Sequence, residues 1–392
     1  MKKILLFACI LLSIGNSFAQ RTILSEQSEI SVLTIGAGNS LNDAFGHSAF
    51  RVKDIIKGTD YVFNYGVFDF NTPNFYLKFA QGKLNYLIGF DYYDDFFERY
   101  ISENRTIKEQ VLNLTFDEKQ TLFNYLLNNY KPENRGYLYD FFFDNCATKI
   151  KDVTNVAVNN AIQFNTPKDY KEATFRTLIH NNLNKNSWGS LGIDVALGSV
   201  IDRKATAEEH MFLPENIYKF LEVATINNSK PLVKSSKVLF SKIEKPESNN
   251  FFVSPLFVFG ILGLFILFIT FKDYKNHKQS KWLDVVLFVI TGLVGILILL
   301  LWFATDHKGT HQNYNLLWAF ALNIVFINQI VRKKPVAWFI KYLKFLVILL
   351  CLLTLHWIIG VQVFAVGLIP FLIALFVRYL YLIYYYNKVK SI

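Results

Sequence analysis

The sequence has little charge for its length. Only 18% of its 392 residues are Asp, Glu, Lys or Arg, whereas 52% are hydrophobic and 38 are Phe. Disordered chains are rich in charge and poor in aromatic residues, so this composition excludes disorder as the main state of the chain. Acidic residues are scarce in residues 251–392, which contain three of them against 13 Lys or Arg.

The net charge of +10 is confined to the most apolar parts of the chain. Residues 20–250, which are polar enough to fold in water, carry 26 basic and 28 acidic side chains. A nucleic-acid-binding domain needs a basic face, so we expect no nucleic-acid partner. The excess of basic over acidic side chains lies in residues 1–19 and 251–392.

Residues 1–19 have the pattern of a secretory signal peptide. Two lysines precede an apolar run from Ile4 to Ile14, and small residues follow at Ser17 and Ala19, where a signal peptidase requires them. We expect cleavage after Ala19 and an exported mature chain. An uncleaved anchor is the alternative, which the short apolar run disfavours.

Cysteine is also scarce. Cys9 leaves with the signal peptide and Cys351 lies in an apolar run, so Cys146 is alone in the exported domain. It has no partner for an internal disulfide. A free thiol in an oxidising compartment is either buried and inert or kept for its reactivity, and composition leaves both interpretations open.

Residues 251–392 contain several apolar runs long enough to cross a bilayer. We expect about five transmembrane helices, or alternatively four, near residues 251–271, 282–303, 316–331, 337–359 and 361–383. Lys and Arg gather in the first and third loops and in the C-terminal tail, whereas the second loop has only Lys308. Because basic loops stay in the cytoplasm, this pattern predicts an external soluble domain and a cytoplasmic C-terminus.

Residues 20–225 have the patterns of a mixed α and β domain. Strands are expected at residues 30–35, 47–52 and 61–70, the last two as a hairpin. Thr115 and Glu118 form a capping-box pattern for a helix that ends at Pro132. The polar stretch 226–250 is expected to be a linker to the first span.

Cys146 stands at the expected start of a helix. Asp144 or Asn145 is a suitable N-cap. An apolar helical stripe follows at Cys146, Ile150, Val153 and Ala157. A helix N-terminus stabilises a thiolate and can hold an oxyanion, which favours a nucleophile, but the stripe is equally compatible with an inert core cysteine.

A nucleophilic cysteine needs a base, and the soluble domain has three histidines. His47 begins a strand beside Gly46, where the ring stays accessible, whereas His180 and His210 lie in polar sequence and are expected at the surface. A cysteine at a helix start facing a histidine on a strand is the papain-like arrangement. We therefore predict Cys146 as the nucleophile and His47 as its base.

Several short motifs resemble those of one family, the Lnb N-terminal periplasmic domain family. They are FGHSAFRV at residues 45–52, FNYG at 63–66, FDF at 68–70, PENR at 132–135, DNCAT at 144–148, LG at 197–198 with Asp202, MFLP at 211–214 and NYNLLW at 313–318. The resemblance extends from about residue 30 to about residue 330 and so includes both halves of the chain. One departure is Lys149, where many relatives are expected to have Arg.

The resemblance implies a lipoprotein N-acyltransferase, which transfers an acyl chain from a phospholipid to the amino group of a lipoprotein's N-terminal diacylglyceryl-cysteine through a cysteine thioester. It implies an α+β papain-like domain of the permuted NlpC/P60 type, followed by an all-α transmembrane domain. The family's His and Cys correspond to His47 and Cys146. The implied location is the bacterial inner membrane, with the catalytic domain in the periplasm. The implied partners are the phospholipid donor and the diacylated lipoprotein, and no cofactor is implied.

The third catalytic group is less defined than the first two. A hairpin register that placed residue 64 opposite residue 47 would let Asn64 hold the imidazole of His47. Asp69 is the alternative, and Asn64 could equally be a turn residue at the strand end. Asn145, at the helix start, is a candidate for the oxyanion site.

Other polar residues are candidates for lipid binding. Arg105 and Arg135, each in a Glu-Asn-Arg triplet, could bind phosphate, with surface ion pairs as the alternative. His307 and Asn315 in the second loop are expected to line the lipid entrance. His307 and His311 have metal-like spacing, but no closed ligand set accompanies them, so we expect no metal site.

The same Cys–His pair would hydrolyse its substrate if water reached the thioester. A membrane-tethered cysteine hydrolase, either a cell-wall peptidase or a phospholipase, is therefore the alternative function. A peptidase would not need five spans, and no wall-binding repeat is present. A transporter or scaffold with an inert Cys146 is a third class of function. The spans contain few ionisable groups, which disfavours an ion pathway through them.

Overall fold

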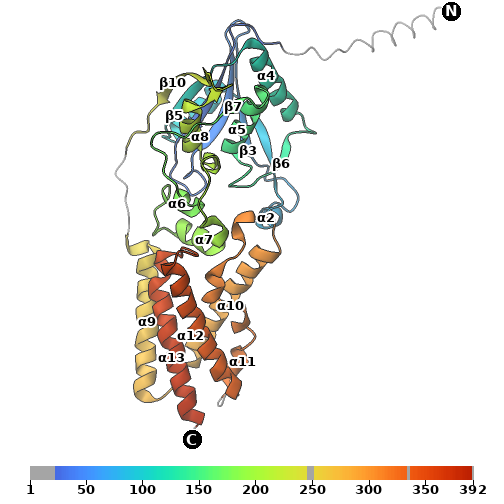
Figure 1. Ribbon diagram of the computed structural model, residues 1–392. Coiled ribbons are helices and arrows are strands. Elements are labelled where there is room, and N and C mark those ends of the chain that lie inside the picture. Colours follow the sequence, from blue (N-terminus) through green and yellow to red (C-terminus); the bar gives the residue numbers. More distant parts are fainter. Residues whose placement is uncertain (1–22, 245–250, 333–335, 391–392) are drawn as a thin grey trace, which may run out of the picture.

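The protein is described by a computed structural model for residues 23–244, 251–332 and 336–390. A sheet-containing α/β domain extends to residue 244 and stands on a bundle of helices formed from residue 251 onward (Figure 1). This arrangement confirms the expected α+β domain followed by an all-α transmembrane domain. The expected signal peptide lies outside the described residues, as do residues 245–250 of the expected linker.

The α/β domain contains these elements in chain order: β1 (Glu29–Ile35), β2 (His47–Asp54), β3 (Thr59–Val67), α2 (Phe75–Ala80), β4 (Asn85–Tyr92), α3 (Tyr93–Ser102), β5 (Ile107–Leu112), α4 (Phe116–Tyr130), β6 (Gly136–Leu138), α5 (Cys146–Ala157), β7 (Ile162–Gln163), α6 (Phe175–His180), α7 (Trp188–Ala196), η1 (Ser199–Ile201), η2 (Glu209–Phe212), α8 (Pro214–Val223), β8 (Thr225–Ile226), β9 (Lys230–Pro231) and β10 (Val233–Phe240).

Seven of these strands form one antiparallel sheet in the order β10-β5-β1-β2-β3-β4-β6. Successive strand residues point to opposite faces, so Val32 packs with α4, α5 and α8, whereas Leu33 packs with α3. β2 and β3 form the predicted hairpin. The predicted capping box also forms, with Glu118 N donating to Thr115 Oγ1 at 3.3 Å, and α4 ends two residues before Pro132.

The prediction that residues 226–250 form a linker is wrong for most of the described part, residues 226–244. β8 pairs with β7 on one side and with β9 on the other in a small sheet, and β10 is an edge strand of the main sheet, paired with β5. An edge strand has one side in water and is commonly polar and charged. The sequence VKSSKVLF at residues 233–240 is polar for this reason and therefore resembled a linker.

The bundle contains η3 (Phe251–Val253), α9 (Pro255–Asn276), α10 (Lys281–Phe303), η4 (Lys308–Thr310), η5 (Tyr314–Leu317), η6 (Ala321–Asn323), α11 (Ile327–Val331), α12 (Ala337–Ile358), η7 (Val366–Leu368) and α13 (Ile369–Lys390). In the described part of the chain, four helices are long and apolar enough to cross a membrane: α9, α10, α12 and α13.

The third expected span, residues 316–331, is not a regular helix but a series of short helical turns. It passes so close to α10 that a Cβ at Gly295 would lie 2.1 Å from the Ala319 carbonyl oxygen. Asn323 is fully buried, donates to Thr291 on α10 and accepts a hydrogen bond from Tyr342 on α12. Non-helical backbone is tolerated at membrane depth when protein surrounds it.

This segment still runs the length of the bundle. At one end, Asn315 donates to the Asp194 carbonyl of the α/β domain at 2.9 Å. At the other end, the Val331 carbonyl accepts a hydrogen bond from Lys281, the first residue of α10. Within the residues that the structure describes, the chain therefore passes along the bundle five times, four times as a long helix.

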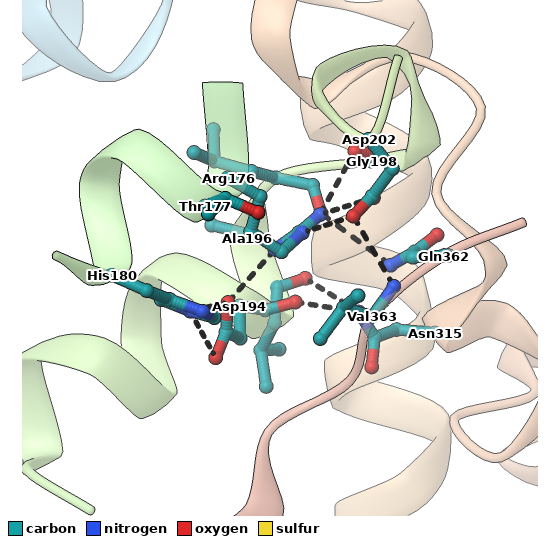
Figure 2. A network of polar contacts seen from close by, with 12 residues as sticks. Arg176, Thr177, His180, Asp194, Ala196, Gly198, Asp202, Asn315, Gln362 and Val363 are labelled. Atoms are coloured by element: carbon teal, nitrogen blue, oxygen red, sulfur yellow. Dashed lines mark hydrogen bonds and ion pairs between the residues drawn. The ribbon is translucent and has the colours of Figure 1, made fainter. Parts of the chain in front are cut away.

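The α/β domain is held on the bundle by a buried polar network, shown in Figure 2. Its centre is Arg176 on α6, which is fully buried and forms ion pairs of 2.8 Å with both Asp194 and Asp202. It also donates to the carbonyls of Leu197 and Gly198 at 3.1 and 3.0 Å. Arg176 thereby fixes the turn after α7.

The bundle binds this same turn through its amide side chains and backbone. Asn313 donates to the Val195 carbonyl at 2.8 Å, and Asp202 accepts a hydrogen bond from the Val363 backbone. A Cβ at Gly198 would lie 1.8 Å from the His311 carbonyl oxygen, so only glycine permits this approach. The expectation that His180 and His210 lie at the surface is wrong: His180 bonds Asp194, and His210 is buried against Tyr170.

Replacing Arg176 by Ala is expected to lower the free energy of unfolding by about 3–5 kcal/mol, because two buried carboxylates would lose their cation. Thermal unfolding of the detergent-solubilised full chain, followed by tryptophan fluorescence, measures the effect. Arg203→Ala is the control, since Arg203 pairs with Glu209 near the surface and its loss should cost less than about 1 kcal/mol. An unchanged melting temperature for Arg176→Ala would contradict this account.

Candidate active site

Cys146 is the first residue of α5, and Asn145 is its N-cap. The Asn145 side-chain oxygen accepts hydrogen bonds from Ala147 N and Thr148 N at 2.8 and 3.0 Å, and Thr148 Oγ1 accepts one from Asn145 N. The predicted stripe from Cys146 to Ala157 is buried against the sheet. The cysteine is therefore held at the first turn of a packed helix.

Asn145 itself is engaged on all sides. Its amide nitrogen donates to the carbonyls of Phe141 and Phe212 at 2.7 and 2.8 Å, in addition to the two bonds that its oxygen accepts. The side chain was expected as an oxyanion ligand, but both amide hydrogens already have acceptors. Asn145 instead fixes where α5 begins relative to η2.

His47, the first residue of β2, lies between Cys146 and Asn64. Its Nε2 atom forms a hydrogen bond with the Asn64 side-chain oxygen, and the ring is close enough to Cys146 for the two groups to shift each other's pKa. Because Nε2 is occupied by Asn64, Nδ1 is the ring nitrogen that remains available for another partner. The structure thus brings together the three residues predicted as catalytic, while Asp69 accepts a hydrogen bond from Asn71 N in an exposed turn.

The strand register that produces this contact differs from the expected one. The paired residues of β2 and β3 end at Phe50 with Phe63, so His47 and Asn64 meet through their side chains beyond the paired part of the hairpin. Gly66 has φ +91°, a backbone conformation that favours glycine, at an irregularity in the pairing with β4. A Cβ there would lie 3.9 Å from Cys146 Cβ, an ordinary contact distance, so Gly66 lies directly beside the cysteine.

The electrostatics of the pair favour a thiolate and an imidazolium. Burial opposes ionisation of Cys146, but the nearby His47 charge and hydrogen bond, together with the N–H groups of Ser48 and Ala147, outweigh it and lower the thiol's pKa. Burial likewise opposes a charged His47, but the Cys146 thiolate outweighs it and raises the imidazole's pKa. Each group stabilises the charged form of the other.

Arg105 lies behind the histidine and not at the surface. It is buried, donates to the Gly36 carbonyl at 3.0 Å and to Glu103 at 3.1 Å, and its guanidinium lies 4.8 Å from the Tyr100 ring. Tyr100 in turn stacks on His47 at 6.5 Å. Its expected role as a phosphate ligand finds no support in this geometry, because Arg105 already holds the loop after β1.

The remaining predicted lipid-binding residues are dispersed. Arg135 is exposed between α4 and β6, and none of its hydrogen bonds in the described residues involves the Cys146–His47 pair. Asn315 was expected at the lipid entrance but is fully buried between the domain and the bundle. His307 does face the α/β domain, with its Nε2 3.1 Å from the Phe79 carbonyl oxygen.

Tyr139, which lies beside the thiol, and Tyr86, which stacks on Tyr139, were missed in the sequence. The Tyr139 ring stacks on Tyr86 at 4.3 Å, and its Cε2 atom would lie 3.9 Å from a Cβ at Gly66. Tyr139 precedes the cysteine by seven residues, so its place beside the helix start could have been considered. Tyr86 is on β4, far away in sequence, and no local pattern indicates it.

The described residues contain no group of three or more His, Cys, Asp or Glu side chains that could hold a metal ion. A cysteine at a helix N-terminus, bonded to a histidine that a side-chain amide orients, is the arrangement of papain-like cysteine enzymes. Here the histidine strand precedes the cysteine helix in the chain.

Two family models match the chain. The Lnb N-terminal periplasmic domain matches residues 16–181, and the Lnb transmembrane domain matches residues 246–390. The chain is therefore an Lnb-type protein, a membrane protein with a periplasmic domain. No curated protein and no solved structure gives a significant match.

The alkylation rate of Cys146 is expected to stay high below the pH at which a free thiol ionises, because the pKa of this thiol is lowered. His47→Ala should raise that pKa and slow alkylation at pH 6–7, since each unit of pKa reduces the thiolate fraction about tenfold. Iodoacetamide labelling in a Cys351→Ala background, read by mass spectrometry of the Cys146 peptide, gives the pH profile.

Asn64 and Asp69 provide a matched comparison in the same assay. Asn64→Ala should shift the profile toward that of His47→Ala, because the imidazole loses its orienting partner, whereas Asp69→Ala should leave it unchanged. The opposite ranking would remove Asn64 from the site.

Proposed function

We propose that this protein is a lipoprotein N-acyltransferase, which moves a fatty acyl chain from a phospholipid to the α-amino group of a lipoprotein's N-terminal diacylglyceryl-cysteine. The observation that carries the proposal is the Cys146–His47 pair within a periplasmic domain docked on a transmembrane bundle. Phe142, four residues before Cys146, packs against Gly309 of the bundle. A nucleophile beside a bilayer suits lipid substrates.

In the first half-reaction, the Cys146 thiolate attacks the carbonyl carbon of a phospholipid ester. A C–S bond forms, and the carbonyl oxygen becomes an oxyanion at the N-terminus of α5, where the helix dipole favours negative charge. The C–O bond then breaks. The His47 imidazolium gives its proton to the departing lysophospholipid oxygen, which leaves an acyl thioester on Cys146 and a neutral imidazole.

In the second half-reaction, the lipoprotein amine attacks the thioester carbonyl. Neutral His47 takes the amine's proton, the C–S bond breaks, and the thiolate–imidazolium pair is restored with an amide as product. Amines attack thioesters readily, and an amide is far more stable than a thioester. The thioester therefore links acyl transfer from an ester to a thiol, which is nearly balanced in free energy, to transfer from the thiol to an amine, which is strongly favourable.

The charges of the bundle support the proposed orientation. Lys272, Lys275 and Lys278 are exposed around the end of α9 that lies away from the α/β domain, and Arg332 is exposed at the same end as Lys281. This end is at the bottom of Figure 1, near the C-terminus. Because basic ends stay in the cytoplasm, we propose an inner-membrane protein with its active site in the periplasm.

Incubation of the purified protein with phospholipid alone is expected to add one acyl chain to Cys146 and to release an equal amount of lysophospholipid. Addition of a diacylated lipopeptide with a free α-amine should then discharge the thioester and give the triacylated product. Mass spectrometry of the Cys146 peptide and of the lipopeptide follows both steps.

The controls separate transfer from hydrolysis. A lipopeptide whose α-amine is acetylated should not discharge the thioester, and Cys146→Ala should form neither product while unfolding at the parent temperature. Continuous release of free fatty acid without an acceptor would make the protein a hydrolase instead. Formation of triacylated product by Cys146→Ala would contradict the proposed mechanism.

A further inference from the structure

An exposed apolar segment joins β3 to β4 beside the bundle. This β3–β4 loop, residues 68–81, includes α2, none of whose residues is buried. Tyr76 is 78% exposed and Leu77 57%. Phe70 and Phe79 are exposed as well. So many exposed large apolar side chains in one short segment mark a surface that contacts something other than water.

The β3–β4 loop is attached to the end of a transmembrane helix. The Gln81 carbonyl accepts a hydrogen bond of 2.8 Å from Asp306 N, three residues beyond the end of α10, and His307 bonds the Phe79 carbonyl. A Cβ at Gly82 would lie 3.1 Å from His307 N, so these two segments of the chain are in close contact. Figure 1 shows α2 directly above α10.

Two tryptophans lie where the α/β domain meets the bundle. Trp302 lies at the end of α10, and half-exposed Trp188 donates to the Val253 carbonyl just before α9 begins. Tryptophan is enriched where a membrane protein passes from lipid to water. By this criterion the expected boundary of the bilayer lies close to α2 and its exposed apolar side chains.

A row of aromatic rings leads from this loop toward the nucleophile. Phe68 contacts Phe75 of α2 at 5.8 Å and Tyr86 of β4 at 5.6 Å, and Tyr86 stacks on Tyr139 at 4.3 Å. Tyr139 and Cys146 both lie 3.9 Å from the place of a Gly66 Cβ. The rings form an apolar path between the bilayer surface and the thiol.

We propose that the β3–β4 loop inserts into the periplasmic surface of the bilayer and that this row of rings guides a lipid acyl chain to Cys146. The guiding role rests on the proposed function, whereas insertion of the loop does not. The occupant of the exposed surface is the acyl and glycerol region of membrane phospholipids.

Spin labelling tests insertion without any catalysis. All three cysteines are replaced by Ala, and a label is placed at Leu77→Cys or, as control, at Ile56→Cys, which is 63% exposed in the turn between β2 and β3. In vesicles of phosphatidylethanolamine and phosphatidylglycerol, the Leu77 label should be relaxed more by oxygen than by a water-soluble nickel chelate, and the Ile56 label the reverse.

Equal behaviour of the two labels would overturn insertion. A Leu77 label shielded from both oxygen and nickel would also overturn it, because protein, such as a second copy of the chain, would then cover the loop.

Acylation of Cys146 tests the guiding role. Leu77→Asp should slow acylation by bilayer phospholipid about tenfold or more, because a carboxylate resists entry into the interface. Acylation by a water-soluble short-chain phospholipid should stay within about twofold of the parent, since the Cys146–His47 pair is intact. Ile56→Asp should change neither rate.

An equal loss with both donors would overturn the guiding role. If the parent protein were acylated by neither donor, the proposed function would fail while the spin-label result stood on its own.

Discussion

The position of the active site relative to the bilayer depends on one buried cation. Arg176 neutralises Asp194 and Asp202 and fixes the turn between them, and the carbonyls of that turn accept hydrogen bonds from amides of the bundle. A buried ion pair adds little net stability, but removal of one partner is costly. The network therefore acts chiefly as a specific joint, which holds the periplasmic domain in one orientation.

The site itself is built mainly by backbone geometry. Asn145 determines where α5 begins, and Gly66, with its positive φ, forms the irregular end of β3 beside Cys146. Neither residue touches a reacting atom in the proposed reaction. This backbone geometry brings a helix N-terminus and a strand end together, so that Cys146 and His47 each stabilise the charged form of the other.

Features encoded by neighbouring residues were predictable from the sequence. The hairpin, the capping boxes and the helix that begins at Cys146 follow from patterns a few residues long, and motif resemblance indicated the family. The register at Gly66, the edge strand β10 and the burial of Asn315 depend on partners far away in the chain, so no local pattern contains them. Likewise, the apolar residues of 316–331 indicated a passage along the bundle, but its irregular form depends on close contact with the glycines of α10.

That irregular third passage has a consequence for the order of membrane assembly. Its backbone does not complete its own hydrogen bonds as a regular helix does, so α10 and α12 must shield it from lipid. The ribosome makes α12 after this segment. The segment can therefore adopt its final structure only once α12 has entered the membrane. Folding of this half of the protein thus does not follow the order of the sequence.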